Sequence, residues 1–394
     1  MIQIVFISIV SFLSFLSEEK AVLSQQEHAS LNAILSKAKT LPPRAYTSPA
    51  IFDRELETIF RKEWVCVARE DQIPGAGDYK SVEVVDQPLI VVRLKDNTVH
   101  AMSSICPHRA MQVVNDSGNT RSFSCPYHLW KFGLDGGLIS APHMDNVEDF
   151  PPPNCGLKSV KVEIWEGFIF VNLDPESQPL RQRLGKLDEE ISEYRMADLV
   201  VVASSEFDCP WNWKILVENF MEAYHHIGPH LESIQPSHNA KDSYVSGSVS
   251  NGWSVLHMPE VEGFQQDETG QLPMIEGITE KQQSEILASL IMPTFAWLNS
   301  PSVAFWYELK PSAYNKMKLV IHTLLPGEIA RSADGADIAT LVQSTIEHIH
   351  LEDIAVNEGP WKGLNAPLTE QGPLSHLEEA IWQMNQWWSQ RIQG

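Results

Sequence analysis

The chain has 394 residues, of which 43% are hydrophobic and 9% aromatic, and this composition is typical of a globular protein with a sizeable core. Its formal net charge of -22 argues against a nucleic-acid binder and against attachment to an anionic membrane, because both need a basic face. The five cysteines are an odd number spread along a long chain, which argues against a secreted disulfide framework and favours the cytoplasm.

The first 40 residues are interpreted as an N-terminal extension. The apolar start MIQIVFISIVSFLSFLS is long enough for a signal-peptide core, but it lacks a positively charged beginning and a clear cleavage site, and it is short for a transmembrane helix. We interpret it as a frayed or non-native extension, with export as the alternative. A polar helix is expected around residues 25–39. After the break at Leu41-Pro42-Pro43, the helix opened by Ser48-Pro49 is expected to begin the folded part.

A small antiparallel β domain is predicted next. From about Asp78 to Asn172 the sequence has short alternating runs such as PLIVVRL, separated by turn signals such as Asp135-Gly136-Gly137. With the preceding helix, this domain is assigned to residues 41–178, and PESQP at 175–179 is expected to be a linker.

Residues 179–394 are assigned to a second, α+β domain, in which helices alternate with strands such as SVAFWYEL and MKLVIHTLL. Its last helix is expected to begin at Ser375, where Glu378 three residues later completes a capping box. The residues of this helix that are expected to point inward are Ile381, Met384, Trp387 and Trp388.

The β domain carries a first candidate metal site. Cys106-x-His108 is followed, after sixteen residues, by Cys125-x-x-His128, so each of two loops offers one thiolate and one imidazole. Two thiolates can hold one iron of a [2Fe–2S] cluster while two imidazoles hold the other. A zinc site is the main alternative, but zinc fingers keep their cysteines close together, and likewise their histidines.

At these residues the sequence resembles the Rieske domain, whose signature is C-x-H in one loop and C-x-x-H in another. The agreement extends to Arg109 and to Trp130, whereas Ala110 stands where a glycine is more usual. Trp130 and Tyr127 are expected to pack over the cluster.

A second candidate site begins in NWKILVENFMEAYHHIGPH. Helical spacing from Trp213 to Tyr224 places Glu222 and His225 on one face. Gly228-Pro229 then breaks the helix, which allows His230 to turn back beside His225, while His226 should point elsewhere.

Two histidines and one carboxylate are the ligands of non-haem Fe(II) oxygenases, so a carboxylate is sought downstream. Asp353 in HLEDIAVNEGPWKGL is the preferred third ligand. The residues that composition leaves open as rivals are Glu347, His348, His350 and Glu352.

The chain from about Leu41 onward resembles the α subunits of the Rieske non-haem iron oxygenases. The resemblance implies a helix-grip (START/Bet v 1-like) catalytic domain with a curved antiparallel sheet, and a head-to-tail homotrimer. It implies that Cys106, His108, Cys125 and His128 hold the cluster, and that His225, His230 and Asp353 hold the Fe(II). It also implies that Glu222, with Asn219 close by, links the iron to the cluster of a neighbouring subunit.

The resemblance also implies partners. Because the sequence has no Rossmann-type glycine motif, electrons from NAD(P)H should arrive through a separate reductase, and a ferredoxin or a β subunit (α3β3) remains open. A Rieske-type electron carrier without oxygenase activity would end near residue 175, and a zinc-stabilised protein would hold no iron.

The substrate is expected to be a small organic molecule. Glu222 and the ending GPLSHLEEAIWQMNQWW resemble the branch of choline-type, carnitine-type and N-dealkylating monooxygenases. Monooxygenation with O2 is therefore preferred over cis-dihydroxylation of an aromatic ring. The aromatic residues that could line a pocket or cradle a cation are Trp297, Phe305, Trp306 and Tyr307, although their alternating β pattern favours core packing.

Overall fold

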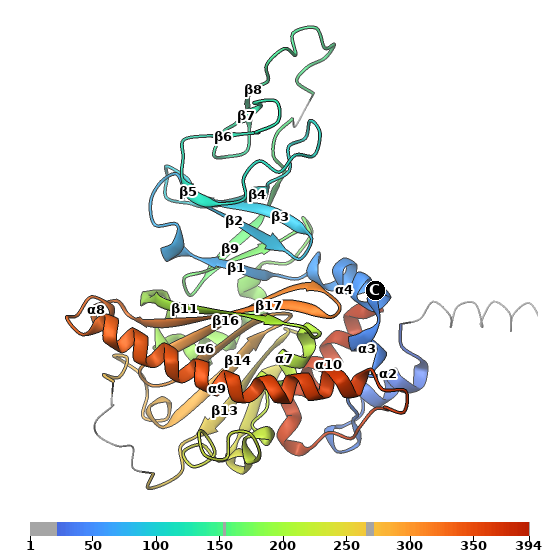
Figure 1. Ribbon diagram of the computed structural model, residues 1–394, viewed down its shortest axis with the longest axis vertical. Helices are drawn as coiled ribbons and strands as arrows, with labels where there is room; N and C mark the ends of the chain where they lie inside the picture. The colour runs from blue at the N-terminus through green and yellow to red at the C-terminus, as the bar shows by residue number, and fades with distance from the viewer. Residues whose placement is uncertain (1–21, 153–154, 265–271, 394) are drawn as a thin grey trace, which may run out of the picture.

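The structure is a computed structural model that describes residues 22–152, 155–264 and 272–393 (Figure 1). The apolar segment of the first 17 residues lies outside the described residues. No helix in these three ranges is both long enough and apolar enough to cross a bilayer.

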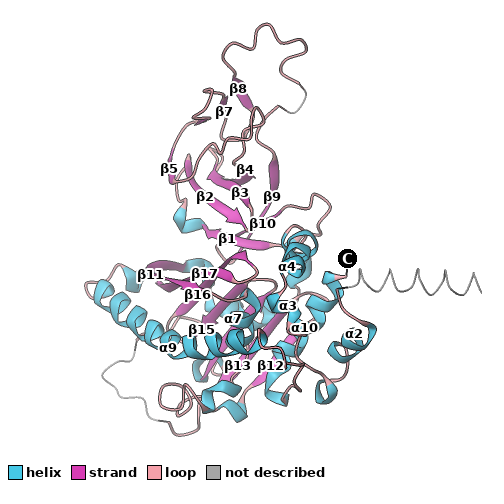
Figure 2. Cartoon of the chain, turned by 45° about the vertical axis from the view of Figure 1, so that its right-hand side comes forward, coloured by secondary structure: helices cyan, strands magenta, loops and turns pink. Residues whose placement is uncertain are grey.

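The first part of the chain folds into an antiparallel sheet of seven strands in the order β1-β10-β9-β4-β3-β2-β5, with a smaller sheet, β6-β7-β8, beyond it (Figure 2). The strands of the larger sheet are β1 (Val65–Arg69), β2 (Asp78–Val84), β3 (Gln87–Arg93), β4 (Val99–Ser103), β5 (Ser117–Asn119), β9 (Ser159–Trp165) and β10 (Phe168–Asn172). Those of the smaller sheet are β6 (Phe123–Ser124), β7 (Lys131–Phe132) and β8 (Leu138–Ser140). This arrangement confirms the predicted antiparallel β domain.

The second part contains another antiparallel sheet of seven strands, in the order β11-β17-β16-β15-β14-β13-β12. These strands are β11 (Leu199–Cys209), β12 (Tyr244–Ser248), β13 (Trp253–Pro259), β14 (Glu285–Ile291), β15 (Phe295–Asn299), β16 (Ala304–Ala313) and β17 (Lys316–Pro326). The helices are α2 (Gln25–Leu31), α3 (Arg44–Thr47), α4 (Pro49–Glu55), α5 (Leu180–Leu184), α6 (Leu187–Ile191), α7 (Trp213–Phe220), α8 (Gly327–Ala330), α9 (Gly335–Leu364) and α10 (Glu379–Ile392). The α+β class is therefore confirmed, while the domain limits at residues 41, 178 and 179 stay predictions.

Helix α9 runs across one face of the second sheet and contacts β11 and β17, as the predicted helix-grip arrangement requires (Figure 1). It spans 30 residues, and Val342, Ile346 and His350 face inward at helical spacing. Helix α7 packs beside α9, so these two helices and the sheet enclose a space between them.

The opposite face of the second sheet packs against the first sheet. Trp165 and Phe168 make edge-to-face contacts with Phe295, and Phe168 does so with Trp306 at a ring distance of 5.3 Å. Because aromatic pairs of this kind bury large apolar areas, they join the two sheets through one continuous core.

The N-terminal region differs from the sequence expectation. Helix α2 ends at Leu31, shorter than the predicted helix of 25–39, and it packs against α10. Leu31 is fully buried, and the indole of Trp382 donates a hydrogen bond to the carbonyl oxygen of Ala33. The folded part therefore begins before the Leu41 break, because apolar residues of this segment complete a core that is built by the C-terminal helix.

Two helix starts match the sequence expectation. Pro49 occupies the first turn of α4, and Phe52, Ile59 and Phe60 are buried along it and the π-helical turn that follows. At the other end of the chain, Ser375 and Glu378 form the predicted capping box, which opens a 3-10 turn of His376–Glu378 that continues into α10 at Glu379. The inward residues predicted for α10 are all buried, namely Ile381, Met384, Trp387 and Trp388.

Candidate metal centres

The two Cys/His loops have the same backbone design. In the loop after β4, the N–H of Cys106 donates to Met111 and the N–H of Ala110 donates to Cys106; in the loop after β6, Cys125 donates to Trp130 and Leu129 donates to Cys125. Ala110 and Leu129 occupy equivalent places, with φ of 54° and 59°. This left-handed conformation costs a residue with a Cβ about 1–2 kcal/mol, which explains why glycine would be favoured at position 110.

Four potential donors gather between these loops. The rings of His108 and His128 lie 4.6 Å apart, and the thiols of Cys106 and Cys125 are buried and close to each other. Burial raises the pKa of Cys106, and the neighbouring Cys125 adds to this shift, so metal binding must displace a proton there.

The aromatic neighbours pack on the imidazoles of these loops. Trp130 stacks on His108 with 4.8 Å between ring centroids and 5° between planes, and Tyr127 lies against His128 at 3.8 Å. Nδ1 of His128 is buried and has no hydrogen-bond partner among the described residues, as suits a nitrogen that needs a metal. Two inner thiols and two outer imidazoles therefore fit the ligand set of a Rieske cluster.

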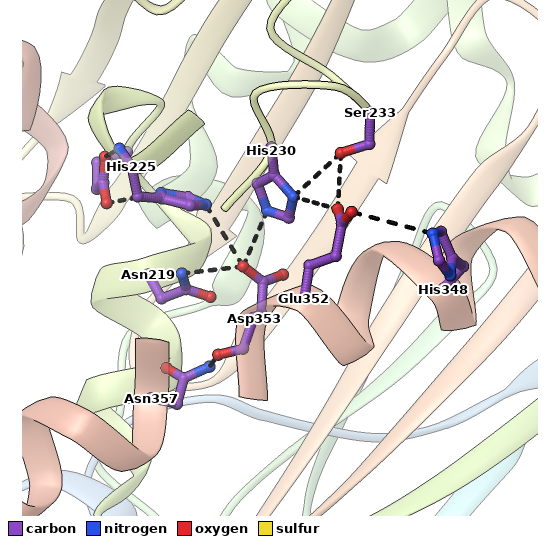
Figure 3. A network of polar contacts seen from close by, with 9 residues as sticks. Asn219, His225, His230, Ser233, His348, Glu352, Asp353 and Asn357 are labelled. Atoms are coloured by element: carbon purple, nitrogen blue, oxygen red, sulfur yellow. Dashed lines mark hydrogen bonds and ion pairs between the residues drawn. The ribbon is translucent and has the colours of Figure 1, made fainter. Parts of the chain in front are cut away.

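The second centre brings together three residues from distant parts of the sequence. The ligand atoms of His225, His230 and Asp353 all lie within 4.8 Å of one another (Figure 3). Nε2 of His230 is 2.9 Å from Oδ1 of Asp353, and Nε2 of His225 is 3.5 Å from the same oxygen. Two imidazoles and one carboxylate that converge in this way fit a non-haem Fe(II) site.

The chain reaches this geometry in a way that the sequence did not predict. Helix α7 ends at Phe220, before the expected break at Gly228-Pro229, and a short 3-10 helix of Tyr224–Ile227 follows. Between them, the carboxylate of Glu222 accepts the backbone N–H of His225 at 2.9 Å. A side chain that satisfies a free helical N–H in this way starts a new turn and aims His225 at the centre.

Two carboxylates hold the outer nitrogens of the histidines. Nδ1 of His225 is 2.7 Å from Oε1 of Glu222, and Nδ1 of His230 is 2.7 Å from Oε2 of Glu352. Such contacts fix the tautomer and the ring orientation of metal-binding histidines, and leave Nε2 of both rings facing Asp353.

Charge pairing shifts the pKa values of all three residues. Burial opposes the charged form of His225, but its contacts with Asp353 and Glu222 outweigh burial and raise the pKa to about 9. The pKa of His230 is also raised, and that of Asp353 is held well below its usual range by both histidines despite burial. The three residues thus form a strongly coupled polar cluster in a largely apolar surrounding.

Asparagine side chains position Asp353 from two sides. Nδ2 of Asn219 donates to Oδ1 of Asp353 at 3.3 Å, and Asn357 donates to its backbone carbonyl at 2.9 Å (Figure 3). The family resemblance predicts Asn219 close to Glu222, whereas its hydrogen bond in the structure goes to Asp353.

The four alternatives to Asp353 as the third ligand have other contacts or positions. Glu347 accepts a hydrogen bond from Ser205, His348 is exposed, and Glu352 binds the far side of His230. His350 is buried at the wall of the cavity.

His226 lies beside the centre without joining the ligand group. Its ring is 4.9 Å from that of His225 and 5.4 Å from that of His230, and burial lowers its pKa to about 3, with the neighbouring histidines adding to the shift. It is therefore a neutral packing partner, and its Nδ1 has no described hydrogen-bond partner.

A cavity of about 310 Å³ opens beside the centre. Phe305 and Tyr307 line it, while the other two aromatic candidates, Trp297 and Trp306, are buried in the core on the opposite face of the sheet. Successive side chains of a strand point to opposite faces of the sheet, so Phe305 and Tyr307 face the cavity while Trp306 faces the core. Further residues that the sequence did not indicate also line the cavity, namely Leu216, Phe220, Ser233, Ser237, His238, Ser300, Thr345, Ile346 and Ile349. The helical spacing of Ile346, Ile349 and Asp353 was a signal that could have placed three of the wall positions together.

Comparisons with known proteins agree with this arrangement. Residues 63–151 match the family described as Rieske [2Fe-2S] domain, and residues 196–394 match the family described as ring hydroxylating alpha subunit (catalytic domain). Carnitine monooxygenase oxygenase subunit from Acinetobacter baumannii is 36% identical over 195 residues, which are 49% of this chain and 52% of that protein. The chloroplastic choline monooxygenase of Amaranthus tricolor is 25% identical and covers 90% of this chain and 78% of its own.

Among solved structures, a quaternary ammonium Rieske monooxygenase in complex with L-carnitine superposes with a TM-score of 0.77. The sequence identity is 24%, and the match covers 93% of this chain and 99% of that one, which shows a shared fold. The chain spans about half the length of the first curated relatives that it matches.

Proposed function

Because the chain belongs to the ring-hydroxylating α-subunit family and carries a Rieske [2Fe-2S] domain, we propose that it is the oxygenase component of a Rieske monooxygenase. Its reaction is the hydroxylation or N-dealkylation of a quaternary or N-methylated amine with O2. The similarity to carnitine and choline monooxygenases supports this reaction class over cis-dihydroxylation of an aromatic ring.

The residues divide between two tasks. Cys106, Cys125, His108 and His128 would hold the cluster, and Nε2 of His225 and His230 with the carboxylate of Asp353 would hold the iron. When bound, the cluster supplies one-electron transfer and the Fe(II) supplies activation of O2. Glu222 and Glu352 keep the Nδ1 atoms protonated and the rings oriented, and Asn219 and Asn357 hold Asp353 in place.

The proposed assembly is a head-to-tail homotrimer, in which the cluster of one copy serves the iron of the next. Two exposed apolar patches support it. The tip patch (Met111, Tyr127 and Leu129) surrounds the cluster loops, and the helix patch (Tyr224, Ile227 and Leu231) adjoins the iron ligands. The tip patch lies in the loops that follow β4 and β6, whereas the helix patch follows α7, and in Figure 2 the first sheet stands between the β7–β8 end of the molecule and α7. A contact between unlike patches closes into a ring of copies, which would bring Glu222 of one copy near the cluster of its neighbour.

The partners follow from the same chemistry. The sequence has no Rossmann-type glycine motif, so in this proposal a separate reductase, with or without a ferredoxin, would supply electrons from NAD(P)H. All five cysteines lie in the described part of the chain and none forms a disulfide, which supports a cytoplasmic location.

The observation that carries the proposal is the convergence of His225, His230 and Asp353 beside a cavity, on a chain that also carries the paired Cys/His loops. The test is O2 consumption with a surrogate reductase across N-methylated amines, quaternary amines and arenes, with product identification. About three irons per chain and a Rieske-type EPR signal after reduction are expected. A cis-diol of an arene as the main product would refute the monooxygenase assignment, and iron-replete protein without the EPR signal would refute the Rieske assignment.

A further inference from the structure

The inner cavity, which reaches the metal ligands, has a lining of unusual charge for a site that would bind a zwitterion. None of its described lining residues is a lysine or an arginine. Its two acidic side chains, Glu222 and Asp353, are both engaged by histidines. The remaining wall is mostly aliphatic and aromatic, with a few hydroxyl groups.

A second cavity of about 600 Å³ adjoins the inner one, and we call it the outer cavity. The residues that line both cavities include Ser233, Ser237, His238, Ser300, Phe305 and Thr345, so the two spaces are neighbours across a shared wall. The outer cavity also contains Glu260 and Glu285, and its described lining again has no lysine or arginine.

The two glutamates of the outer cavity are not equivalent. Glu285 is buried and pairs with His257 at 3.1 Å and with Lys281 at 3.7 Å, so much of its charge is balanced. Glu260 is exposed and forms no ion pair with any described residue.

These linings discriminate between charged ligands. A carboxylate that enters the inner cavity loses its hydration and finds no lysine or arginine, and His225 and His230 are already paired with carboxylates of the chain, so its burial is unfavourable. An organic cation instead meets the rings of Phe220, Phe305 and Tyr307, and those of Phe220 and Tyr307 lie 4.7 Å apart. A cation near aromatic faces is attracted by the negative charge of their π electrons.

The metal centre does not oppose such a ligand. The carboxylates of Glu222 and Asp353 together balance the charge of a divalent iron, so a loaded centre has no net positive charge that would repel a cation. Outside, Glu260 adds an attractive field at the mouth of the outer cavity.

Resting on the proposed function, we propose that the substrate is an organic cation without a carboxylate, and that it enters through the outer cavity past Glu260. This separates the chain from its carnitine-oxidising relatives, because carnitine carries a carboxylate as well as a quaternary nitrogen. Selection of a cation over a zwitterion comes from two features. Neither described lining contains a lysine or arginine that could pair with a carboxylate, and Glu260 places a negative charge at the outer cavity.

Choline and glycine betaine are a matched pair of probes, because they share the trimethylammonium group and differ in a hydroxymethyl group against a carboxylate. Dissociation constants measured by anaerobic calorimetry on the iron-loaded protein should favour choline over glycine betaine and carnitine by at least tenfold. The neutral isostere 3,3-dimethylbutan-1-ol should bind at least threefold more weakly than choline. Equal or tighter binding of either carboxylated compound would overturn the proposal, and so would equal binding of the neutral isostere.

A substitution at Glu260 tests whether the substrate enters past this residue. Glu260→Gln should raise KM for choline about two- to fivefold at low ionic strength with kcat unchanged, and added salt should remove the difference. Glu328→Gln, an exposed glutamate on α8 outside both cavities, should change neither value. An unchanged KM in Glu260→Gln would refute entry past this residue.

The outcomes separate this inference from the proposed function. If glycine betaine is oxidised as well as choline, the monooxygenase assignment stands and the substrate inference fails. If iron-loaded protein oxidises no amine, the assignment fails, and the calorimetric order of binding still decides the inference.

Discussion

Glu352 accepts a hydrogen bond from Nδ1 of His230 at 2.7 Å, while Asp353, the next residue of α9, faces Nε2 of the same ring at 2.9 Å. Adjacent residues on a helix point about 100° apart, so the two carboxylates contact opposite nitrogen atoms of one imidazole ring. Ser233 also donates to Glu352 at 2.6 Å, which fixes the outer carboxylate. One helix thereby supplies both a proposed iron ligand and the group that orients another proposed ligand.

We predict that Glu352→Gln lowers the affinity for mononuclear iron by about 10- to 100-fold, because His230 loses a charged acceptor for its Nδ1 proton. Iron competition against a chelator would measure this loss. The two irons of the cluster should stay bound. Glu358→Gln, further along the exposed side of α9, is the matched control and should keep normal affinity. Unchanged iron affinity in Glu352→Gln would contradict an orienting role.

Glu222 should matter more for turnover than for metal content. We predict that Glu222→Gln retains both metals and folds normally, but loses most of its activity, because the charged partner of His225 on the proposed electron route is gone. Single-turnover reduction of the iron centre from the cluster, followed optically, would measure the affected step. Full activity with normal coupling of electron use to product would refute this role.

Much of the two centres was predictable because their ligands are close in sequence. Cys106, His108, Cys125 and His128 lie in two loops, and the Gly228-Pro229 break explains why His230 returns beside His225. Asp353 is different, because only the fold brings α9 across the sheet to α7, and its choice over Glu352 depended on a resemblance. No local signal assigned Glu352 to the outer nitrogen of His230.

Other features depend on contacts between distant segments. Helix α2 is short, and its burial against α10 cannot be read from its own polar sequence. Strand alternation indicated that Phe305 and Trp306 face opposite ways, but not which of them faces the cavity. The end of α7 at Phe220 was missed because a side chain, Glu222, replaces the next backbone hydrogen bond.

The tip patch should be needed for assembly. We predict that Leu129→Glu, at a side chain with 66% exposure, weakens association of the copies and reduces turnover while both metals stay bound. Sedimentation velocity would measure the loss of trimer. Ile34→Glu, at a residue of 65% exposure far from the cluster loops in sequence, is the control and should remain trimeric. A trimer that survives Leu129→Glu would exclude this patch from the interface.

A buried ion pair anchors α7, which leads to the proposed iron ligands His225 and His230. Nζ of Lys214 is 2.6 Å from Oε1 of Glu55, both side chains are fully buried, and the indoles of Trp213 and Trp388 donate to the same carboxylate. We predict that Lys214→Met lowers the free energy of unfolding by about 3–5 kcal/mol, because the charge of Glu55 is left without its cation. Urea unfolding would measure this, and adding Glu55→Gln should recover part of the loss. A smaller loss than about 1 kcal/mol would contradict the pairing.

The carboxyl group of Glu218, one turn further along α7, should make stability depend on pH. Burial raises its pKa to about 7 from an ordinary value of 4.5, although the hydroxyl of Tyr46, which donates to it, and the charge of Lys214 oppose the shift. Between these two pH values the folded chain keeps a proton on Glu218 that the unfolded chain has released. The contribution of Glu218 to the free energy of unfolding is therefore fully present below pH 4.5 and is lost as pH rises through 7. The loss from this group is at most about 3 kcal/mol.

Glu218→Gln removes the titrating group, so its free energy of unfolding should rise relative to that of the native chain as pH rises. We expect the difference in free energy of unfolding between variant and native chain to shift in favour of the variant from pH 5 to pH 8, by up to about 3 kcal/mol. Urea unfolding at a series of pH values would measure it. Glu328→Gln, whose exposed side chain lies on α8, should follow the native profile. Parallel profiles for Glu218→Gln and the native chain would show that Glu218 is already ionised across this range, because a group with the same charge in both states contributes no slope.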